Sequence, residues 1–231
     1  MGHEQEDSLL TGILLHKMRK ILKYGSFLLA VAVAAGILAG CSKKAVEVES
    51  LPQYDTEVAE GEQIAVMTIR DYGTIKIRFF KEQAPKAVEN FITHAKQGYY
   101  NELNFHRVIE NFMIQGGDPA GTGAGGPDYC IKGEFSQNGF ENNLAHTPGV
   151  LSMARTMFPD SAGSQFFIMH KAAPHLDGAY AAFGKVTEGL EVVDKIASVN
   201  TDYSDKPLQP QRMATVTVET FGVEYPEPEK C

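Results

Sequence analysis

An arginine and a glutamine in two short apolar runs are the residues best suited to do chemistry. Arg107 lies in the run 105–109 and Gln115 in the run 112–116. Side chains alternate faces along a strand, so Arg107 is expected to share a face with the phenylalanine and isoleucine that end its run, and Met113 with Gln115. An arginine in this setting is either a surface side chain with a buried stem or a working cation.

A second amide lies beside a second large apolar side chain in the run 165–169. Gln165 and Phe167 share a face there by the same alternation. An amide next to an apolar group suits a peptide-binding groove, because the amide orients the peptide and the apolar group grips it. The alternative is that both runs are ordinary strands with half-exposed faces.

Two other patterns suggest different chemistry and are rejected. Residues 121–126 fit the spacing of the dinucleotide-binding fingerprint, but Pro127-Asp128 follows where a phosphate-binding helix would have to begin. Ser164 with a histidine would make a hydrolase, but its neighbours lack the nucleophile-elbow pattern. The seven histidines show no paired ligand spacing, so no metal site is expected.

The elements that must position these residues are mostly short strands. They lack a strand–helix–strand rhythm, which favours an antiparallel β-barrel over a parallel sheet. Two segments have helical spacing of apolar residues, 85–98 and 190–199. The predicted strands are 64–70, 74–80, 105–109, 112–116, 150–154, 165–169, 182–186 and 213–223.

Composition is that of one globular domain with appendages. The chain has 231 residues, 43% of them hydrophobic, and a net charge of -8, which argues against a nucleic-acid partner. Its three cysteines match no zinc pattern. Cys130 is expected to be a small core residue. A disulfide between Cys130 and Cys231 could form outside the cytoplasm, but it is not the expected state.

The first 40 residues have the pattern of a secretory signal peptide. Basic residues at 17–23 precede the apolar run 27–38, which is short for a membrane span. Leu38-Ala-Gly-Cys41 resembles a bacterial lipobox, which implies cleavage before Cys41 and its acylation. The alternatives are a plain signal peptide or an uncleaved anchor. Three acidic residues precede Lys17, so we also predict that translation begins at Met18.

This organisation predicts an extracytoplasmic protein that is lipid-anchored to a bacterial membrane. Residues 41–62 are polar and acidic and are expected to form a flexible tether. Residues 63–224 are expected to form the folded domain, and residues 225–231 a C-terminal tail.

Several motifs together resemble the cyclophilin family of peptidyl-prolyl isomerases. They occur in family order at 105–118 (FHRVIENFMIQGGD), 149–154 (GVLSMA), 163–168 (GSQFFI), 176–178 (LDG) and 183–186 (FGKV). The resemblance implies a closed eight-stranded antiparallel β-barrel capped by two α-helices, and an isomerase without a cofactor. We expect a monomer that acts on proline-containing polypeptides and assists folding outside the cytoplasm. The alternative is a proline-segment-binding or chaperone module in which catalysis is incidental.

The resemblance also assigns roles to individual residues. His175 and Tyr180 stand where many eukaryotic members have tryptophan and histidine, and Arg155 replaces the common asparagine. Because the tryptophan position is linked in the family to cyclosporin binding, weak inhibition by cyclosporin is expected. The implied catalytic residues are Arg107, Gln115 and Phe112, and the implied substrate-binding residues are Met113, Ala154, Arg155, Gln165, Phe167, Leu176, His175 and Tyr180.

Overall fold

The computed structural model describes Val58 and residues 61–231. The predicted signal peptide, the start at Met18, the lipidated Cys41 and nearly all of the tether lie outside these described residues. No helix among the described residues is long and apolar enough to cross a membrane.

Eight strands form one antiparallel sheet in the order β3-β4-β6-β5-β7-β2-β1-β8. Each of the eight predicted strand segments overlaps one of them. The strands are β1 (Ile64–Ile69), β2 (Gly73–Phe79), β3 (Arg107–Ile109), β4 (Met113–Gly116), β5 (Val150–Met153), β6 (Phe166–Met169), β7 (Ala182–Glu188) and β8 (Met213–Glu219).

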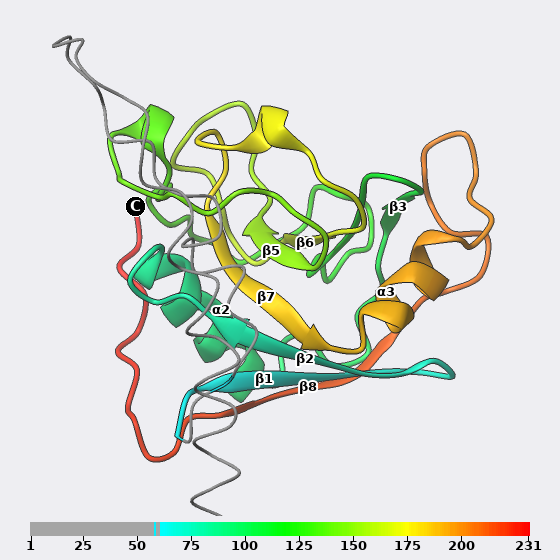
Figure 1. The fold of residues 1–231 in the computed structure, drawn as a ribbon, viewed down its shortest axis with the longest axis horizontal. Helices are drawn as coiled ribbons and strands as arrows, with labels where there is room; N and C mark the ends of the chain where they lie inside the picture. The colour runs from blue at the N-terminus through cyan, green and yellow to red at the C-terminus, as the bar shows by residue number, and fades with distance from the viewer. Residues whose placement is uncertain (1–57, 59–60) are drawn as a thin grey trace, which may run out of the picture. The chain divides into compact units, whose positions relative to one another are not determined.

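The sheet curls into an open half-barrel with β3 and β8 as its edges (Figure 1). The prediction of a closed barrel is therefore wrong. Between the two edges, a single bridge joins Asn104 to Arg212, and the Phe105 N–H donates to the Gln211 carbonyl at 2.9 Å. The Glu102 N–H also donates to the Met213 carbonyl at 2.7 Å, and the Met213 N–H to the Leu103 carbonyl at 2.9 Å. These contacts involve the chain before β3 and do not extend into a ladder between β3 and β8.

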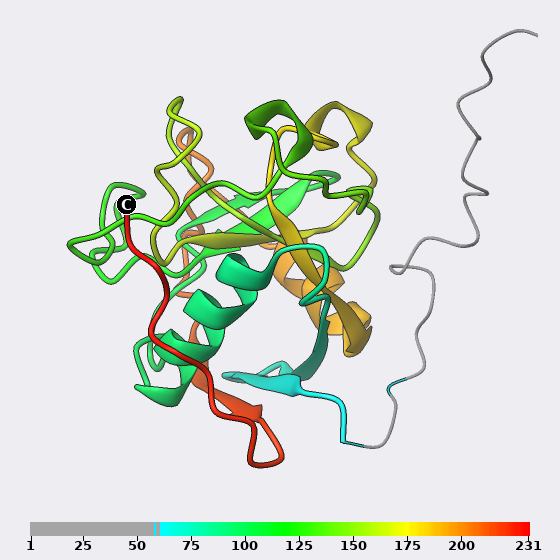
Figure 2. The same cartoon turned by 90° about the vertical axis from the view of Figure 1, so that its left-hand side faces the viewer.

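Two α-helices cover the curled sheet, as predicted. Helix α2 (Pro85–Lys96) packs against β7 and β8, and helix α3 (Leu190–Ala197) against β2, β3 and β4 (Figures 1 and 2). The structure adds two short 3₁₀ helices, η3 (Ser136–Asn138) and η4 (Pro174–Leu176).

Helix α2 begins and ends where its sequence indicates. Pro85 occupies the first turn, where the missing N–H costs nothing. The buried Glu134 side chain, which comes from a distant loop, accepts hydrogen bonds from the N–H groups of Lys86 and Ala87, both at 2.9 Å. Two of the free amides of the first turn are thereby satisfied. Gly98 follows the helix with φ of 69°.

Apolar side chains gather in two clusters, one on each side of the sheet region around β4, β5 and β6. The larger cluster holds α2 and the aromatic side chains of Phe91, Tyr100 and Phe166. The smaller cluster includes Met113 and Phe167, and it is the one that carries the predicted site. The smaller cluster also includes Met169, Leu176, Phe112, Ala154 and Tyr180.

Several predicted boundaries and positions are wrong. Phe105 and Arg107 do not share a face, because β3 begins only at Arg107; Phe105 is buried in the larger cluster and Arg107 is exposed. The last strand ends at Glu219 because a turn with positive φ follows at Phe221 and Gly222. Cys130 is half-buried and does not belong to either apolar cluster.

Candidate functional site

The strand register aligns the predicted site residues across four strands. Arg107 of β3 lies opposite Gln115 of β4, and Gln115 lies opposite Phe167 of β6. Phe167 in turn lies opposite Ser152 of β5. Because directly paired residues point to the same face, the guanidinium, the amide and the phenyl ring form one row.

This row forms part of the wall of a cavity of about 440 Å³. Nine of the eleven predicted catalytic and substrate-binding residues line it. The lining residues are His106, Arg107, Phe112, Met113, Gln115, Gly121, Thr122, Gly123, Ala154, Arg155, Phe167, Leu176, Tyr180, Ser204 and Lys206.

The other two predicted residues lie beside the cavity. His175 stacks on Phe112, with ring centroids 5.8 Å apart. Gln165 lines a neighbouring hollow of about 240 Å³ and accepts a hydrogen bond from Gln115 Nε2 at 2.9 Å. Gln165 Nε2 donates to the carbonyls of Gly123 and Gly125, at 3.0 and 2.8 Å. These bonds fix the orientation of both amides.

The glycine-rich loop over the site is folded around Asp118. Its carboxylate accepts hydrogen bonds from the N–H groups of Ala120, Thr122 and Gly123 at 2.7, 2.9 and 2.6 Å. Burial alone would raise the pKa of Asp118, but these backbone donors and that of Gly125 lower it below its usual value. The amides that a phosphate would need are thus occupied by the protein's own carboxylate.

Arg107 has a partner that the sequence pattern did not suggest. Its Nε lies 3.3 Å from Asp205 Oδ2, in the segment between α3 and β8. The Val108 N–H donates to the Asp205 carbonyl at 2.8 Å and so ties this segment to β3. Ser204 and Lys206 of the same segment line the cavity. Turn-forming residues mark 202–207 as a loop, but nothing in the sequence places that loop beside Arg107.

Arg155 closes another side of the cavity. Its Nη2 and Nε donate to the Ala179 carbonyl at 2.8 and 3.2 Å, and its Nη1 to the Thr156 carbonyl at 2.9 Å. Its guanidinium carbon lies 4.5 Å from the centre of the Tyr180 ring, close enough for a cation–π contact. Arg155 and Tyr180, two of the three departures from the common family residues, therefore support each other.

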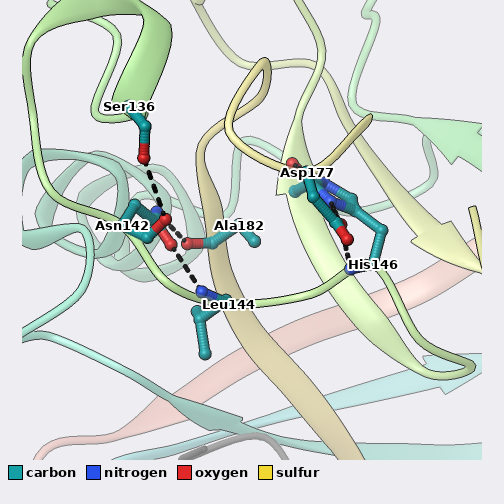
Figure 3. A network of polar contacts seen from close by, with 7 residues as sticks. Ser136, Asn142, Leu144, His146, Asp177 and Ala182 are labelled. Atoms are coloured by element: carbon teal, nitrogen blue, oxygen red, sulfur yellow. Dashed lines mark hydrogen bonds and ion pairs between the residues drawn. The ribbon is translucent and has the colours of Figure 1, made fainter. Parts of the chain in front are cut away.

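A buried polar chain lies behind Phe167. His146 Nε2 is 3.0 Å from Ser152 Oγ, and its Nδ1 is 3.0 Å from Asp177 Oδ1. Figure 3 shows the contact between His146 and Asp177. The His146 ring stacks on Phe167, with centroids 5.9 Å apart. Burial lowers the pKa of His146, against an opposing effect of Asp177. Ser152 is fully buried, so this chain supports Phe167 and cannot attack a substrate.

The polar network continues away from the site. The Asn142 side chain donates to the Ala182 carbonyl at 2.9 Å and accepts from the Leu144 N–H at 3.1 Å (Figure 3). It thereby holds the segment that leads into His146 against β7. The sequence pattern does not reveal this network, because a buried asparagine or histidine has no periodic signal.

Ser164 and His106 are two further polar residues near the site, and both are buried. Ser164 is buried, and its hydroxyl donates to the Gly117 carbonyl at 2.7 Å, so it is not arranged as a nucleophile. His106 lines the cavity with only 7% of its surface exposed, and its ring nitrogens have no hydrogen-bond partner among the described residues. Burial lowers its pKa.

Comparisons with known proteins agree with this geometry. A profile of the family described as "Cyclophilin type peptidyl-prolyl cis-trans isomerase/CLD" matches residues 64–218. A peptidyl-prolyl cis-trans isomerase of Helicobacter pylori is 47% identical over 146 residues, which are 62% of this chain and 87% of that protein. The peptidyl-prolyl cis-trans isomerase-like 2 of Rhizopus delemar is 48% identical over 140 residues, but the match spans about a quarter (26%) of its length.

Solved structures show the same architecture. A crystal structure of a cyclophilin-type peptidyl-prolyl cis-trans isomerase of Cryptosporidium parvum, in the presence of the dipeptide Ala-Pro, is similar with a TM-score of 0.62 and 34% sequence identity. The similarity covers 68% of this chain and 98% of that one.

Proposed function

Because the chain belongs to the cyclophilin-type peptidyl-prolyl cis-trans isomerase family, we propose that its 440 Å³ cavity accelerates rotation about Xaa-Pro bonds. The observation that carries the proposal is the row of Arg107, Gln115 and Phe167, which joins a permanent cation, an oriented amide and an apolar ring on one cavity wall.

The reaction needs no nucleophile, because no covalent bond is broken. An Xaa-Pro bond resists rotation through delocalisation of the nitrogen lone pair into the carbonyl, with a barrier of about 18–20 kcal/mol. Without a catalyst, exchange takes roughly tens to hundreds of seconds. A catalyst must therefore stabilise the twisted amide more than the planar one.

Arg107 is suited to that task. In the twisted state the proline nitrogen becomes pyramidal and regains its lone pair, so a fixed N–H donor aimed at it interacts only then. The guanidinium is always charged and presents several donors in a plane. Asp205 contacts Nε, and no residue in the described part of the chain bonds the two terminal nitrogens of Arg107, which would meet a substrate.

The apolar side of the cavity would hold the proline ring. Met113, Phe167 and Leu176 are each at most 7% exposed and form a firm floor, with Phe112 packed against them. This floor excludes water, which stabilises the polar planar amide better than the twisted one. Gln115 and Gln165, held by their mutual hydrogen bond, would orient the peptide backbone.

In the cell, the proposed substrates are proline-containing polypeptides that fold outside the cytoplasm. The basic and apolar N-terminal pattern and the Leu38-Ala-Gly-Cys41 sequence support a lipid anchor on Cys41. A chain so anchored would act as a monomer at a bacterial membrane, with residues 42–62 as its tether. Stable attachment needs two or more acyl chains.

The isomerase proposal is tested with the full chain and a proline peptide, by exchange NMR or a protease-coupled assay. We expect Arg107→Ala to lower kcat/KM by about 10²–10³, the range for one preorganised donor. Arg70→Ala is the matched control, because Arg70 is also an exposed, ion-paired arginine but contacts Glu102 away from the cavity. Activity in Arg107→Ala within threefold of the control would refute the role of Arg107.

Phe112→Ala tests the apolar side of the cavity. Because it removes a ring that packs on the floor and on His175, we expect a lower kcat/KM. Equal kinetics for Phe112→Ala and the wild type would contradict the proposed proline pocket.

The anchor is tested separately in bacteria that produce the full chain. A palmitate analogue that can be labelled should be incorporated into the wild type and not into Cys41→Ser. Membrane fractionation should then find the wild type with the membrane and the variant released or retained as uncleaved precursor. Equal labelling of both chains would exclude acylation at Cys41.

A further inference from the structure

The segment Tyr225–Cys231 is held against the folded domain along its length. Lys81 Nζ lies 5.0 Å from the centre of the Tyr225 ring, and Lys86 forms an ion pair with Glu229. Lys230 Nζ lies 4.6 Å from the centre of the Tyr129 ring. Figure 2 shows this segment, in red, running past α2 to the end marked C.

Its last two residues pair with the chain that follows the glycine-rich loop. Lys230 and Ile131 form an antiparallel bridge, and the Cys231 N–H donates to the Cys130 carbonyl at 2.9 Å. In an antiparallel bridge the paired numbers have a constant sum, so the partner of Cys231 is Cys130. Directly opposed residues have Cα atoms about 4.5–5.5 Å apart, within the range of about 4.4–6.8 Å that a disulfide spans.

The side chains of this pair also meet. The Cys231 and Cys130 thiols are in hydrogen-bonding contact, and both are free in the structure. Cys231 is exposed and Cys130 is half-buried, so an oxidant can reach the pair from solvent. Backbone pairing, thiol contact and access therefore coincide at one place.

We propose that Cys130 and Cys231 form a disulfide that fastens the segment Tyr225–Cys231 to the chain around Tyr129 and Ile131. The oxidant is another disulfide, either a small molecule or a thiol–disulfide oxidoreductase. One thiolate attacks it and forms a mixed disulfide, releasing one thiol; the second cysteine then displaces the other thiol. The protein loses two protons and two electrons, and the oxidant is reduced to two thiols.

The bond would close a covalent loop that contains part of the site, whereas Arg107, Phe112 and Gln115 lie outside it. The chain between the two cysteines carries Ala154, Gln165, Phe167, Leu176 and Tyr180. Such a long loop loses much conformational entropy in the unfolded chain when it is closed. Burial and the hydrogen bond to Cys130 raise the pKa of Cys231 to about 11, so oxidation should be slow at neutral pH and faster in alkaline buffer.

The test uses the full chain, incubated in oxidised or reduced glutathione and then alkylated. Digestion with a Glu-specific protease should yield residues 111–134 linked to Lys230-Cys231, with a mass roughly 2 Da below the sum of the reduced peptides. Oxidation should raise Tm by about 5–15 °C. The single variants Cys130→Ser and Cys231→Ser are matched controls, and their Tm should not depend on the redox buffer.

Three results would overturn the proposal. They are glutathione attached separately to each cysteine without a cross-linked peptide, a disulfide-linked dimer through Cys231 on non-reducing gels, and an equal effect of oxidation on Tm in the wild type and both variants. None of these measurements uses the isomerase assay, so the disulfide is tested independently of the proposed function.

Discussion

The geometry of the contact between Arg107 and Asp205 predicts how much its loss should lower kcat/KM. The two side chains meet through one pair of atoms, Nε and Oδ2, at 3.3 Å, and are 44% and 41% exposed. Exposed ion pairs of this kind contribute about 0.2–1 kcal/mol. If the pair acts by holding the guanidinium ready for the twisted amide, its loss should lower kcat/KM by about 1.4- to 5-fold.

Asp205→Asn is the appropriate perturbation. It removes the charge but keeps the size of the side chain and the backbone carbonyl that accepts from the Val108 N–H at 2.8 Å. The decrease in kcat/KM should come mainly from kcat, because the ion pair positions the Arg107 guanidinium and does not contact the proline ring of the substrate. High salt should reduce the difference between the two proteins, since the Debye length falls to about 3 Å at 1 M.

A double-mutant cycle isolates the effect. The wild type, Asp205→Asn, Arg107→Ala and the double variant are compared on one proline peptide, with Glu141→Gln as an exposed acidic control outside the cavity. Asp205→Asn should change nothing once Arg107 is absent. A loss above 30-fold, or the same loss in the Arg107→Ala background, would refute the positioning role.

Three further predictions concern stability and inhibitor recognition. Burial lowers the pKa of His94, which is 3% exposed, to about 4. The folded state therefore favours neutral His94, and the free energy of unfolding that this contributes is full above pH 6.5 and is lost as the pH falls toward 4. At pH 5 the loss should be about 2 kcal/mol. Urea unfolding at pH 7 and pH 5 should show this loss in the wild type and not in His94→Phe; equal pH dependence would contradict it. Glu134→Ala should cost about 1–3 kcal/mol in urea unfolding, because it leaves the Lys86 and Ala87 amides at the start of α2 without their acceptor, whereas the exposed Glu141→Ala should cost little. His175→Trp should strengthen inhibition by cyclosporin, which an inhibition assay measures; unchanged inhibition would mean that this position does not control the drug's affinity.

Local patterns predicted the elements well. The apolar stripe and Pro85 located α2, and alternation placed Met113 with Gln115 on the face that lines the cavity. Alternation failed at Phe105, because it applies only while the chain stays extended, and β3 begins two residues later. The resemblance overestimated closure of the sheet, because only a single bridge, between Asn104 and Arg212, joins the two edges, and both residues lie outside β3 and β8.

The sequence by itself determined which residue types can serve the site. It places Arg107, Gln115 and Phe167 in short runs where the alternation of side chains indicates which residues share a strand face. Only the tertiary structure decided that strand register sets these three in one row, that Asp205 reaches Arg107 and that His146 supports Phe167. The physical reason is range: periodicity reports contacts within one element, whereas Asp205 meets Arg107 across 98 residues of chain. Such contacts depend on how the whole sheet curls, which no short stretch of sequence encodes.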